Sequence, residues 1–394
     1  MKVVAPFISY QSPIQRAFTT LPLIVFVTLT FGLAIPAVAE ITGTCRAVPS
    51  VDCLLDEALA LPAVDGATQR LASSSISIAR IQALSGKLVQ AEATFSDAFD
   101  NISASSELPD TDLEALAVGL TEAGLTDQAL NVLNEIKDVI DRNYAARRML
   151  TVMAESGDYP ATYALASRIG TAVWVQEANK SVAIAQARAG NVASAIQTLQ
   201  AVRDQADQQA VMVEIIEAQA KAGDFVAAQV AIVGLADAQF RQSAMIKYAA
   251  VLNEVGHTGV AVLTLRAVND EIMQSDAGFA RDLGLIGLAH AWANIGEVDQ
   301  ALTTVSQITS TGSRDQALSA IVAAVAKHGQ AEQAQAILET IKYPDIRSSA
   351  LVGMAQSLAV AGLFDQALAT VDQIDDTKDR LKAICLVAEA LIQD

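Results

Sequence analysis

Nine glycines recur along the chain at an almost constant interval, and this interval limits what the chain can fold into. Six of the eight gaps between successive members are 33 residues, and the other two are 38 and 40. A period of this size indicates an array of one repeated supersecondary unit. The nine glycines are Gly86, Gly124, Gly157, Gly190, Gly223, Gly256, Gly296, Gly329 and Gly362.

The sequence around each glycine predicts two helices joined by a tight turn. Apolar residues at helical spacing precede the glycine, as Leu351, Met354 and Leu358 precede Gly362. Glycine can adopt the left-handed backbone conformation that ends a helix, because it has no Cβ to clash. Alanine stands five residues after eight of the nine glycines, and Thr162 holds the ninth place. A side chain this small lets two helices approach closely.

We therefore predict an all-α fold, an α-solenoid of about nine helix-turn-helix repeats with terminal capping helices. A single unit of this size cannot bury its apolar face alone, so the units must stack on one another. The array is expected over residues 67–379. Residues 40–66 are expected to form an N-terminal capping segment with a short helix at 51–61, and residues 380–394 a C-terminal capping helix.

The two longer gaps predict local changes in the array. Between Gly86 and Gly124 there are five extra residues, and the polar stretch 103–112 is expected to be a loop. Between Gly256 and Gly296 there are seven extra, close to two helical turns. We expect both helices around 275–278 to be longer there.

The units resemble the tetratricopeptide repeat across residues 67–394. In the first unit Ala79, Gly86, Ala91, Phe95 and Ala98 match five positions of that family's pattern. Later units depart from it at the last position, where isoleucine, valine or leucine replaces the small residue, and the family's proline near the repeat end is missing. The resemblance implies a right-handed superhelix whose first helices line a concave groove. HEAT-like packing is the alternative, less favoured because those units are usually longer.

By this resemblance, exposed positions on the first helix of each unit contact the ligand. Tyr144 with Arg147 and Arg148 forms the most ligand-like cluster, and the alternative is an ordinary solvated helix face. The groove candidates are Tyr144, Arg147, Arg148, Lys180, Arg188, Glu217, Lys221, Asn253, His290 and Asn294.

An arginine also recurs at the junction between units. One interpretation is a ladder of basic contacts for an acidic ligand. The other is that each arginine caps a helix end or pairs with a nearby aspartate. We favour the second, because a residue tied to the repeat period is most simply one that the repeat geometry requires. The arginines are Arg142, Arg241, Arg281, Arg314, Arg347 and Arg380.

Residues 1–39 have the pattern of a signal peptide. Lys2 and Arg16 are their only charged residues, an apolar and hydroxyl run fills 21–35, and the small residues of 37–39 suit a signal peptidase. We expect cleavage and export to the periplasm or the exterior, with no membrane span left, an uncleaved anchor being the alternative. In an oxidising compartment Cys45 and Cys53 could form a disulfide. Cys385, among apolar residues, is expected to be a buried thiol.

The chain is strongly acidic, with 26 Lys and Arg against 44 Asp and Glu and a net charge of −18. Without residues 1–39, which carry two positive charges, the count is 24 against 44, a net of −20. Such a surface repels phosphate backbones, so nucleic acid is not expected as a partner. The charge is sufficiently explained by solubility, although an acidic surface for a basic partner is the alternative.

The sequence offers no catalytic constellation, metal-ligand spacing or cofactor motif. Trp174 and Trp292 lie in different units, which does not suit a sugar-cleaving site between stacked aromatics. We therefore predict an exported, non-catalytic scaffold that binds a protein or peptide partner in the groove. The alternatives are a small-ligand or glycan-binding receptor in the same groove, and a self-associating structural rod.

Overall fold

The computed structural model describes residues 41–61, 67–104, 110–276 and 278–393. All regular secondary structure in these ranges is helical, with no strand, so the prediction of an all-α fold is confirmed. The chain divides into two units, Met1–Ala37 and Val38–Asp394, and every described residue belongs to the second. The predicted signal peptide, residues 1–39, lies outside the described residues.

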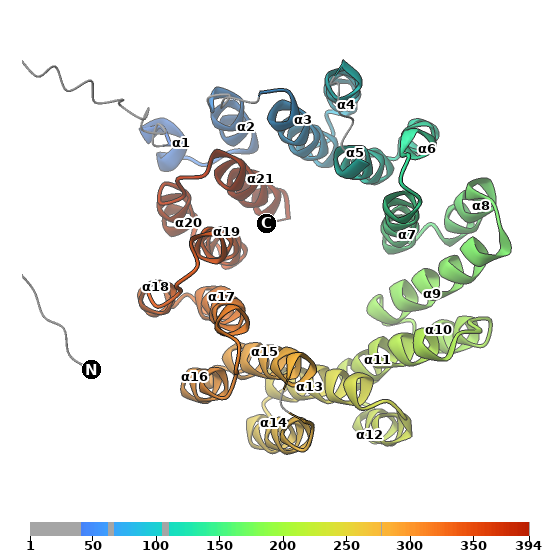
Figure 1. The fold of residues 1–394 in the computed structure, drawn as a ribbon, viewed down its shortest axis with the longest axis vertical. Coiled ribbons are helices and arrows are strands. Elements are labelled where there is room, and N and C mark those ends of the chain that lie inside the picture. The colour runs from blue at the N-terminus through green and yellow to red at the C-terminus, as the bar shows by residue number, and fades with distance from the viewer. Residues whose placement is uncertain (1–40, 62–66, 105–109, 277, 394) are drawn as a thin grey trace, which may run out of the picture. The chain divides into compact units, whose positions relative to one another are not determined.

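Two sets of helices alternate along this second unit (Figure 1). The first set lies on the inside in this view, and its members are here called the inner helices. They are α3 (Ala67–Leu84), α5 (Asp110–Glu122), α7 (Val139–Glu155), α9 (Ala172–Arg188), α11 (Gln205–Lys221), α13 (Ala238–Glu254), α15 (Phe279–Asn294), α17 (Thr311–Lys327), α19 (Pro344–Val360) and α21 (Thr377–Gln393).

The second set lies outside the first, and its members are called the outer helices. The outer helices are α4 (Leu88–Ala104), α6 (Thr126–Glu135), α8 (Tyr159–Ile169), α10 (Val192–Leu199), α12 (Phe225–Gly234), α14 (Thr258–Met273), α16 (Val298–Ser306), α18 (Ala331–Leu338) and α20 (Phe364–Val371). Two further helices, α1 (Gly43–Ala47) and α2 (Val51–Ala60), belong to neither set and precede the array.

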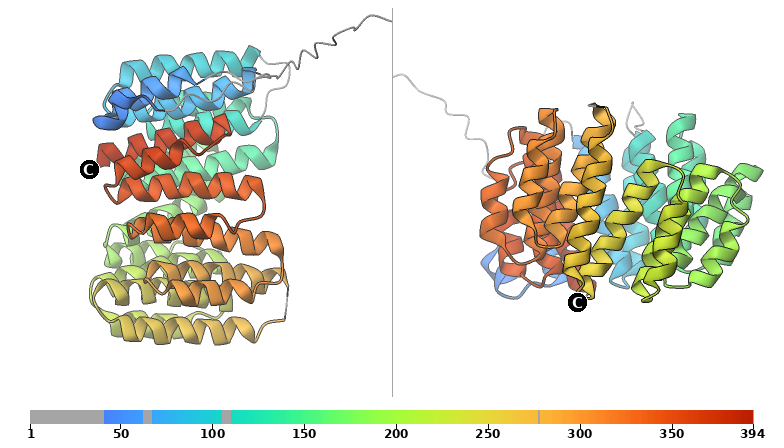
Figure 2. Two further views of the ribbon diagram at one scale, coloured as in Figure 1. Left: turned by 90° about the vertical axis from the view of Figure 1, so that its left-hand side faces the viewer. Right: turned by 90° about the horizontal axis from the view of Figure 1, so that it is seen from below.

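The inner helices form a closed sequence of contacts. Each packs against the inner helix before it and the one after it, and the last, α21, packs against the first, α3. Most outer helices pack on the inner helix of their own hairpin and on the next one along the chain. The helices run side by side along one common direction (Figure 2). The result is a ring of helical hairpins, an all-helical, repeat-like arrangement.

The repeated glycine ends each inner helix in the left-handed conformation. All nine have φ between 74° and 86°. At Gly190 the glycine N–H donates to the carbonyl of Ala187 and the N–H of Asn191 to that of Gln186, a Schellman arrangement. A Cβ added at Gly190 would meet nothing within 4 Å. Backbone conformation, and not space, therefore requires glycine there.

The small residue five positions later packs in the core of each hairpin. All eight alanines at this position, and Thr162 in the unit of Gly157, are 0% exposed. In that unit the Thr162 hydroxyl donates to the carbonyl of Asp158 at 2.9 Å, so its polar group is satisfied within the helix. A larger apolar side chain at these sites would have to displace a neighbouring helix.

We expect Ala367→Leu to lower the free energy of unfolding by about 1–3 kcal/mol, because it overpacks the buried side of α20. The matched control is Ala369→Leu, an exposed position on the same helix, which should change stability by less than about 0.5 kcal/mol. Urea unfolding measures both. Equal effects of the two substitutions would contradict close packing at Ala367.

The recurring arginine has a structural role at several junctions. Arg241 donates to the carbonyl of Leu235 at 3.0 Å, Arg314 to that of Ile308 at 2.8 Å, and Arg347 to that of Ile341. In each case the acceptor lies six residues earlier, where an outer helix has just ended. The arginine thus satisfies a carbonyl that has no partner within the helix. Gln208 does the same for Val202 one unit earlier, at 2.7 Å.

The residue that follows the recurring arginine binds the backbone just before the next inner helix begins. Asp282, only 2% exposed, accepts hydrogen bonds from the N–H groups of Thr309 and Ser310 and from the Thr309 hydroxyl. Burial would raise the pKa of this carboxyl, but these hydrogen bonds outweigh burial and hold the pKa below its ordinary value. Asp315 accepts equivalent bonds from Lys342 and Tyr343 at 2.8 and 2.9 Å. These aspartates therefore fix the position of each following hairpin.

The extra residues in the two longer intervals between glycines make two of the outer helices longer. Helix α4 has 17 residues and α14 has 16, whereas the other outer helices have between 8 and 11. Our expectation that both helices around 275–278 are longer is wrong for the second, because α15, with 16 residues, is no longer than its neighbours. The predicted loop at 103–112 is shorter in the structure, since α4 continues to Ala104 and α5 begins at Asp110; residues 105–109 lie outside the described ranges.

The N-terminal segment lies at the junction between the last and first hairpins. Helix α2 packs on α21 and on α3, the place that an outer helix following α21 would take. Leu54 and Leu55 of α2 and Ile78 of α3 belong to the same hydrophobic core as Ile384 and Val387 of α21. Helix α2 thus completes the last unit and joins it to the first.

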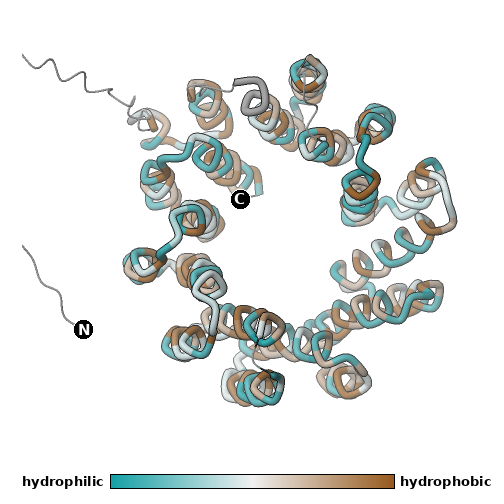
Figure 3. Tube along the Cα trace, in the orientation of Figure 1, coloured by the Kyte–Doolittle hydropathy of each residue, from teal (hydrophilic) through white to brown (hydrophobic). Residues whose placement is uncertain are grey.

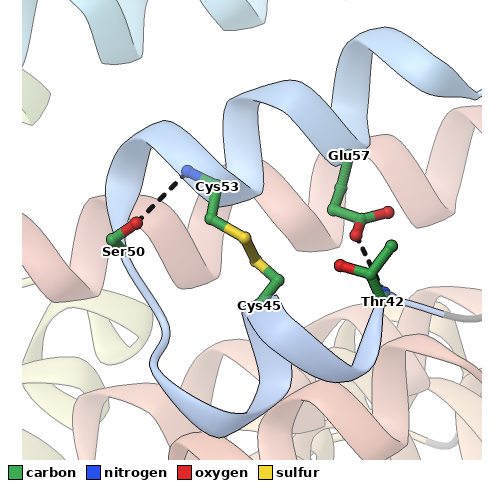
Figure 4. The surroundings of a disulfide bond; sticks show 5 residues. All are labelled: Thr42, Cys45, Ser50, Cys53 and Glu57. Atoms are coloured by element: carbon green, nitrogen blue, oxygen red, sulfur yellow. Dashed lines mark hydrogen bonds between the residues drawn. A yellow bond between two sulfur atoms is a disulfide. The ribbon is translucent and has the colours of Figure 1, made fainter.

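A disulfide and one carboxylate hold this junction together. Cys45 in α1 is bonded to Cys53 in α2, with their Cα atoms 5.6 Å apart (Figure 4). The Asp372 carboxylate at the end of α20 accepts a bond from the Ile41 N–H at 3.0 Å and forms ion pairs with Arg46 and Arg380. Arg380 is 2% exposed, so this charge lies in the core.

We expect Asp372→Ala to lower the free energy of unfolding by about 3–5 kcal/mol, because it removes the carboxylate from a buried arginine. It should also speed hydrogen exchange in α1, because Ile41 and Arg46 lose their bonds to Asp372. Asp375→Ala, at an exposed position in the next loop, is the control and should change little. If both variants unfolded at the same urea concentration, Asp372 would not hold the junction.

Candidate functional site

All ten predicted groove residues lie on inner helices. Tyr144, Arg147 and Arg148 are on α7, and Lys180 and Arg188 on α9. The other five follow on α11, α13 and α15, so the candidates occupy five consecutive inner helices. They are Glu217 and Lys221 on α11, Asn253 on α13, and His290 and Asn294 on α15.

Six of these candidates belong to one set of ion pairs between neighbouring inner helices, here called the inner-face network. Arg148 pairs with Glu114 of α5 at 2.7 Å, and Arg147 with Glu177 of α9 at 3.5 Å. Lys180 lies between Glu177 of its own helix, at 3.4 Å, and Asp207 at the start of α11, at 2.9 Å.

The network continues through α9, α11 and α13. Arg188 pairs with Glu155 of α7 at 2.6 Å and with Glu214 of α11 at 3.1 Å. Lys247 of α13 pairs with Glu214 at 3.1 Å and also with Glu217, which in turn pairs with Lys221 at 2.7 Å. Charges on the five inner helices α5, α7, α9, α11 and α13 are therefore largely compensated by charges on the neighbouring inner helices.

The pairs also shift the pKa values of their members. Burial would lower the pKa of Lys180, but the carboxylates of Asp207 and Glu177 outweigh burial and raise the pKa above its ordinary value. Burial would raise the pKa of Glu217, yet Lys221 and Lys247 hold that pKa below its ordinary value. Both groups keep their charges at neutral pH.

The remaining candidates have other surroundings. Tyr144 is 55% exposed. The Asn253 side chain accepts a bond from the Thr258 hydroxyl across the turn that ends α13, at 2.8 Å, which is a local structural contact. His290 bonds to the Asn294 side chain at 3.1 Å, and the backbone carbonyl of Asn294 lies 2.9 Å from Nε2 of His328. Tyr144 and His290 are thus the candidates outside the network that stay at the surface, although neighbouring side chains remove part of the His290 ring from water.

Most of the acidic partners in the network were not predicted from the sequence. Glu114, Glu155, Glu177 and Glu214 were not recognised as site residues, and neither was Lys247. The sequence did contain a signal for these ion pairs, because equivalent positions of adjacent units lie side by side in a repeat array. Charged residues of both signs recur at exactly one repeat length on the four helices from α7 to α13: Glu155, Arg188, Lys221 and Glu254.

Several other features of the described residues bear on function. Trp292 is 2% exposed and belongs to the core. The part of the chain that the structure describes contains no group of three side chains suited to a metal ion. Within the same ranges no helix combines the length and apolar character needed to span a bilayer.

No protein-family model matches the chain, and no curated protein matches it. Among solved structures, the crystal structure of Ton1535 from Thermococcus onnurineus NA1 is similar over 77% of this chain and 83% of that one, with 18% sequence identity and a TM-score of 0.29. At that TM-score the likeness carries no argument about arrangement or function.

We expect His290 to titrate below the ordinary pKa of histidine, because burial and the nearby Lys327 both disfavour its charged form. Since the unfolded chain binds the proton more readily, this residue lowers stability as the pH falls through the ordinary histidine range and has no effect above that range. Lys327→Gln should raise the pKa only in part, because burial remains.

An NMR titration of the His290 ring protons measures this shift. The exposed Lys342→Gln is the control and should leave the titration unchanged. A His290 pKa at or above the ordinary value in the unmodified protein would contradict this account of its surroundings.

Proposed function

We propose that the chain is an exported, non-catalytic scaffold that binds a protein or peptide on the inner helices. The observation that carries the proposal is that the positions expected to contact a ligand come together on consecutive inner helices. Two of them are well exposed: the Arg147 side chain is 57% exposed, and Tyr144 as a whole residue is 55% exposed. We name this set of positions on α7 to α15 the inner face.

The proposal includes a finer description of the fold. In it the hairpins are tetratricopeptide-like units of an α-solenoid, stacked in a right-handed sense, and the path returns to its start at α2 and α3. The closed sequence of helix contacts and the left-handed glycine turns support this description. A HEAT-like packing of the same hairpins is the alternative.

The chemistry of the inner face favours a polar, extended ligand over a compact apolar one. Its charges are of both signs and already paired, so a polypeptide carrying both signs could exchange partners with them one pair at a time. The arginines of these pairs keep side-chain exposures of 46–57%, so a ligand can reach them, while their acidic partners Glu114, Glu177 and Glu214 are only 12–13% exposed. Binding should then weaken as salt screens the exchanged pairs.

Export is proposed from the sequence of residues 1–39, and the disulfide between Cys45 and Cys53 supports it, since disulfides persist in oxidising compartments. In that setting the partner would be an envelope or extracellular polypeptide. Nucleic acid remains an unexpected partner for a chain of net charge −18.

Two functions from other classes remain as alternatives. The inner face could bind a small ligand or a glycan, or the protein could be a self-associating structural element. Each predicts a different bound species: a soluble metabolite or sugar in the first case, and another copy of this chain in the second.

We expect a photo-crosslinking residue at Tyr144 to capture a polypeptide when the exported protein is in its native envelope. The same residue at Val89, 84% exposed on the outer helix α4, is the control and should not capture it. Mass spectrometry identifies the product, and the purified partner should protect amides of α7 and α9 from hydrogen exchange.

Capture at Val89 alone, or of the same polypeptides at both positions, would contradict binding on the inner face. A crosslink to a second copy of the chain would favour the structural element, and a protected inner face without any polypeptide would favour the small ligand. Hydrolysis of a polysaccharide or peptide, lost on substituting one acidic residue, would contradict a non-catalytic role.

A further inference from the structure

A polar hollow of about 400 Å³ lies where two successive outer helices pass into inner helices. It is formed by the later part of α6, the start of α7, the end of α8 and the start of α9, and we call it the α6–α9 hollow. A volume of this size is within the range of small-ligand pockets. The polar and aromatic side chains that line it are those of Asn131, Asn134, Arg142, Asn143, Arg168 and Trp174.

Two of these residues occupy positions that serve the fold in other units. Arg142 stands at the repeat position of Arg241, which caps the carbonyl of Leu235. Asn143 stands at the position of Gln209, which accepts the N–H of Asp237 in the following junction at 2.9 Å, as Asp282 and Asp315 do in later units. In these other units both side chains are occupied by the backbone.

At Arg142 and Asn143 these structural bonds are not made. Both residues are half-buried, yet among the described residues neither side chain has a hydrogen bond or an ion pair. A guanidinium and an amide that are partly removed from water usually have protein partners. Here both groups instead line the hollow, where they are available to a ligand.

Two further residues complete the chemistry of the hollow. Arg168 brings a second guanidinium and pairs with Asp127 at 2.7 Å, but the Asp127 side chain is 84% exposed, so this pair is weakly held. Trp174, partly buried, contributes its indole to the lining of the hollow. The hollow thus contains one guanidinium without a carboxylate partner among the described residues, that of Arg142, and one whose carboxylate partner is exposed to solvent.

We propose that the α6–α9 hollow binds an acidic saccharide, a small hydroxylated carboxylic acid of one or two sugar residues. Guanidinium groups bind carboxylates through paired, charge-assisted hydrogen bonds. The amides of Asn131, Asn134 and Asn143 offer donors and acceptors to hydroxyl groups. The indole face of Trp174 suits the apolar face of a sugar ring. This site is separate from the inner face and does not rest on the function proposed for it.

Isothermal titration calorimetry on the full mature chain tests the site with galacturonic acid as the probe. We expect galacturonic acid to bind about tenfold or more tightly than galactose, which lacks the carboxylate, and than acetate, which lacks the hydroxyls. No binding of galacturonic acid would overturn the proposal. Equal binding of acetate or of triglycine would also overturn it, because the hollow would then recognise only a carboxylate.

Two matched variants separate the binding role from a structural one. Arg142→Gln should weaken galacturonic acid binding about tenfold or more and leave the melting temperature unchanged, since this side chain caps nothing. Arg347→Gln should do the reverse, because Arg347 caps Ile341 far from the hollow. If Arg142→Gln lowered the melting temperature as Arg347→Gln does, or left binding intact, Arg142 would not be a ligand-binding residue.

Discussion

The rest of the structure depends on how the two ends of the helical array are covered. Every hairpin buries its apolar face against the next, so an open array leaves one such face unpaired at each end. Here the last inner helix, α21, packs against the first, α3, and α2 fills the place of the missing outer helix. Exposed end faces are thereby avoided, and the ends stabilise each other. The closure is reinforced by polar groups, above all Asp372, which joins Ile41, Arg46 and Arg380.

The repetition of the hairpin also explains the arrangement of charges on the inner helices. Equivalent positions of adjacent hairpins lie side by side, so a charge on one inner helix meets a charge one repeat later, and opposite signs form the inner-face network. Hydrophilic and hydrophobic residues are mixed along the helices of both sets (Figure 3), and α12, with the sequence FVAAQVAIVG, is almost wholly apolar. Where a unit departs from the periodic contacts, as at Arg142 and Asn143, side chains are released from the fold and a hollow lies beside them.

The fold class followed from the sequence because its determinants are local. Glycine at a fixed interval, an alanine five residues on and apolar residues at helical spacing are all visible without knowing any long-range contact. The closing contact was not predictable in the same way. Helix α2 was expected to cover the first hairpin, and nothing local in Leu54 or Leu55 indicates that it packs mainly on α21, more than 300 residues later. The pairing of Cys45 with Cys53 was anticipated as possible, but its place at the closure was not.

The candidate site was predictable in part. The resemblance to tetratricopeptide units gave positions that all fall on inner helices, since those positions follow from the repeat. The ion-pair partners of these positions could not be predicted in this way. The carboxylates of Glu114 and Glu214 come from neighbouring units, and whether a pair forms depends on how far each side chain reaches. The prediction that the recurring arginines serve the fold is confirmed at Arg241, Arg314 and Arg347, which each donate to a backbone carbonyl. Sequence alone could not reveal that Arg142 and Arg281, in the same series, cap no carbonyl; Arg281 donates to the Met273 sulfur at 2.9 Å instead.

The most direct test of this account is a distance between the two ends of the array in solution. Spin labels at Leu59 on α2 and at Lys382 on α21, both exposed positions, can be measured by pulsed electron paramagnetic resonance. A closed ring predicts one short, narrow distance distribution that persists until the protein unfolds. A long or broad distribution in the folded protein would show that the ends do not meet, and would contradict the account.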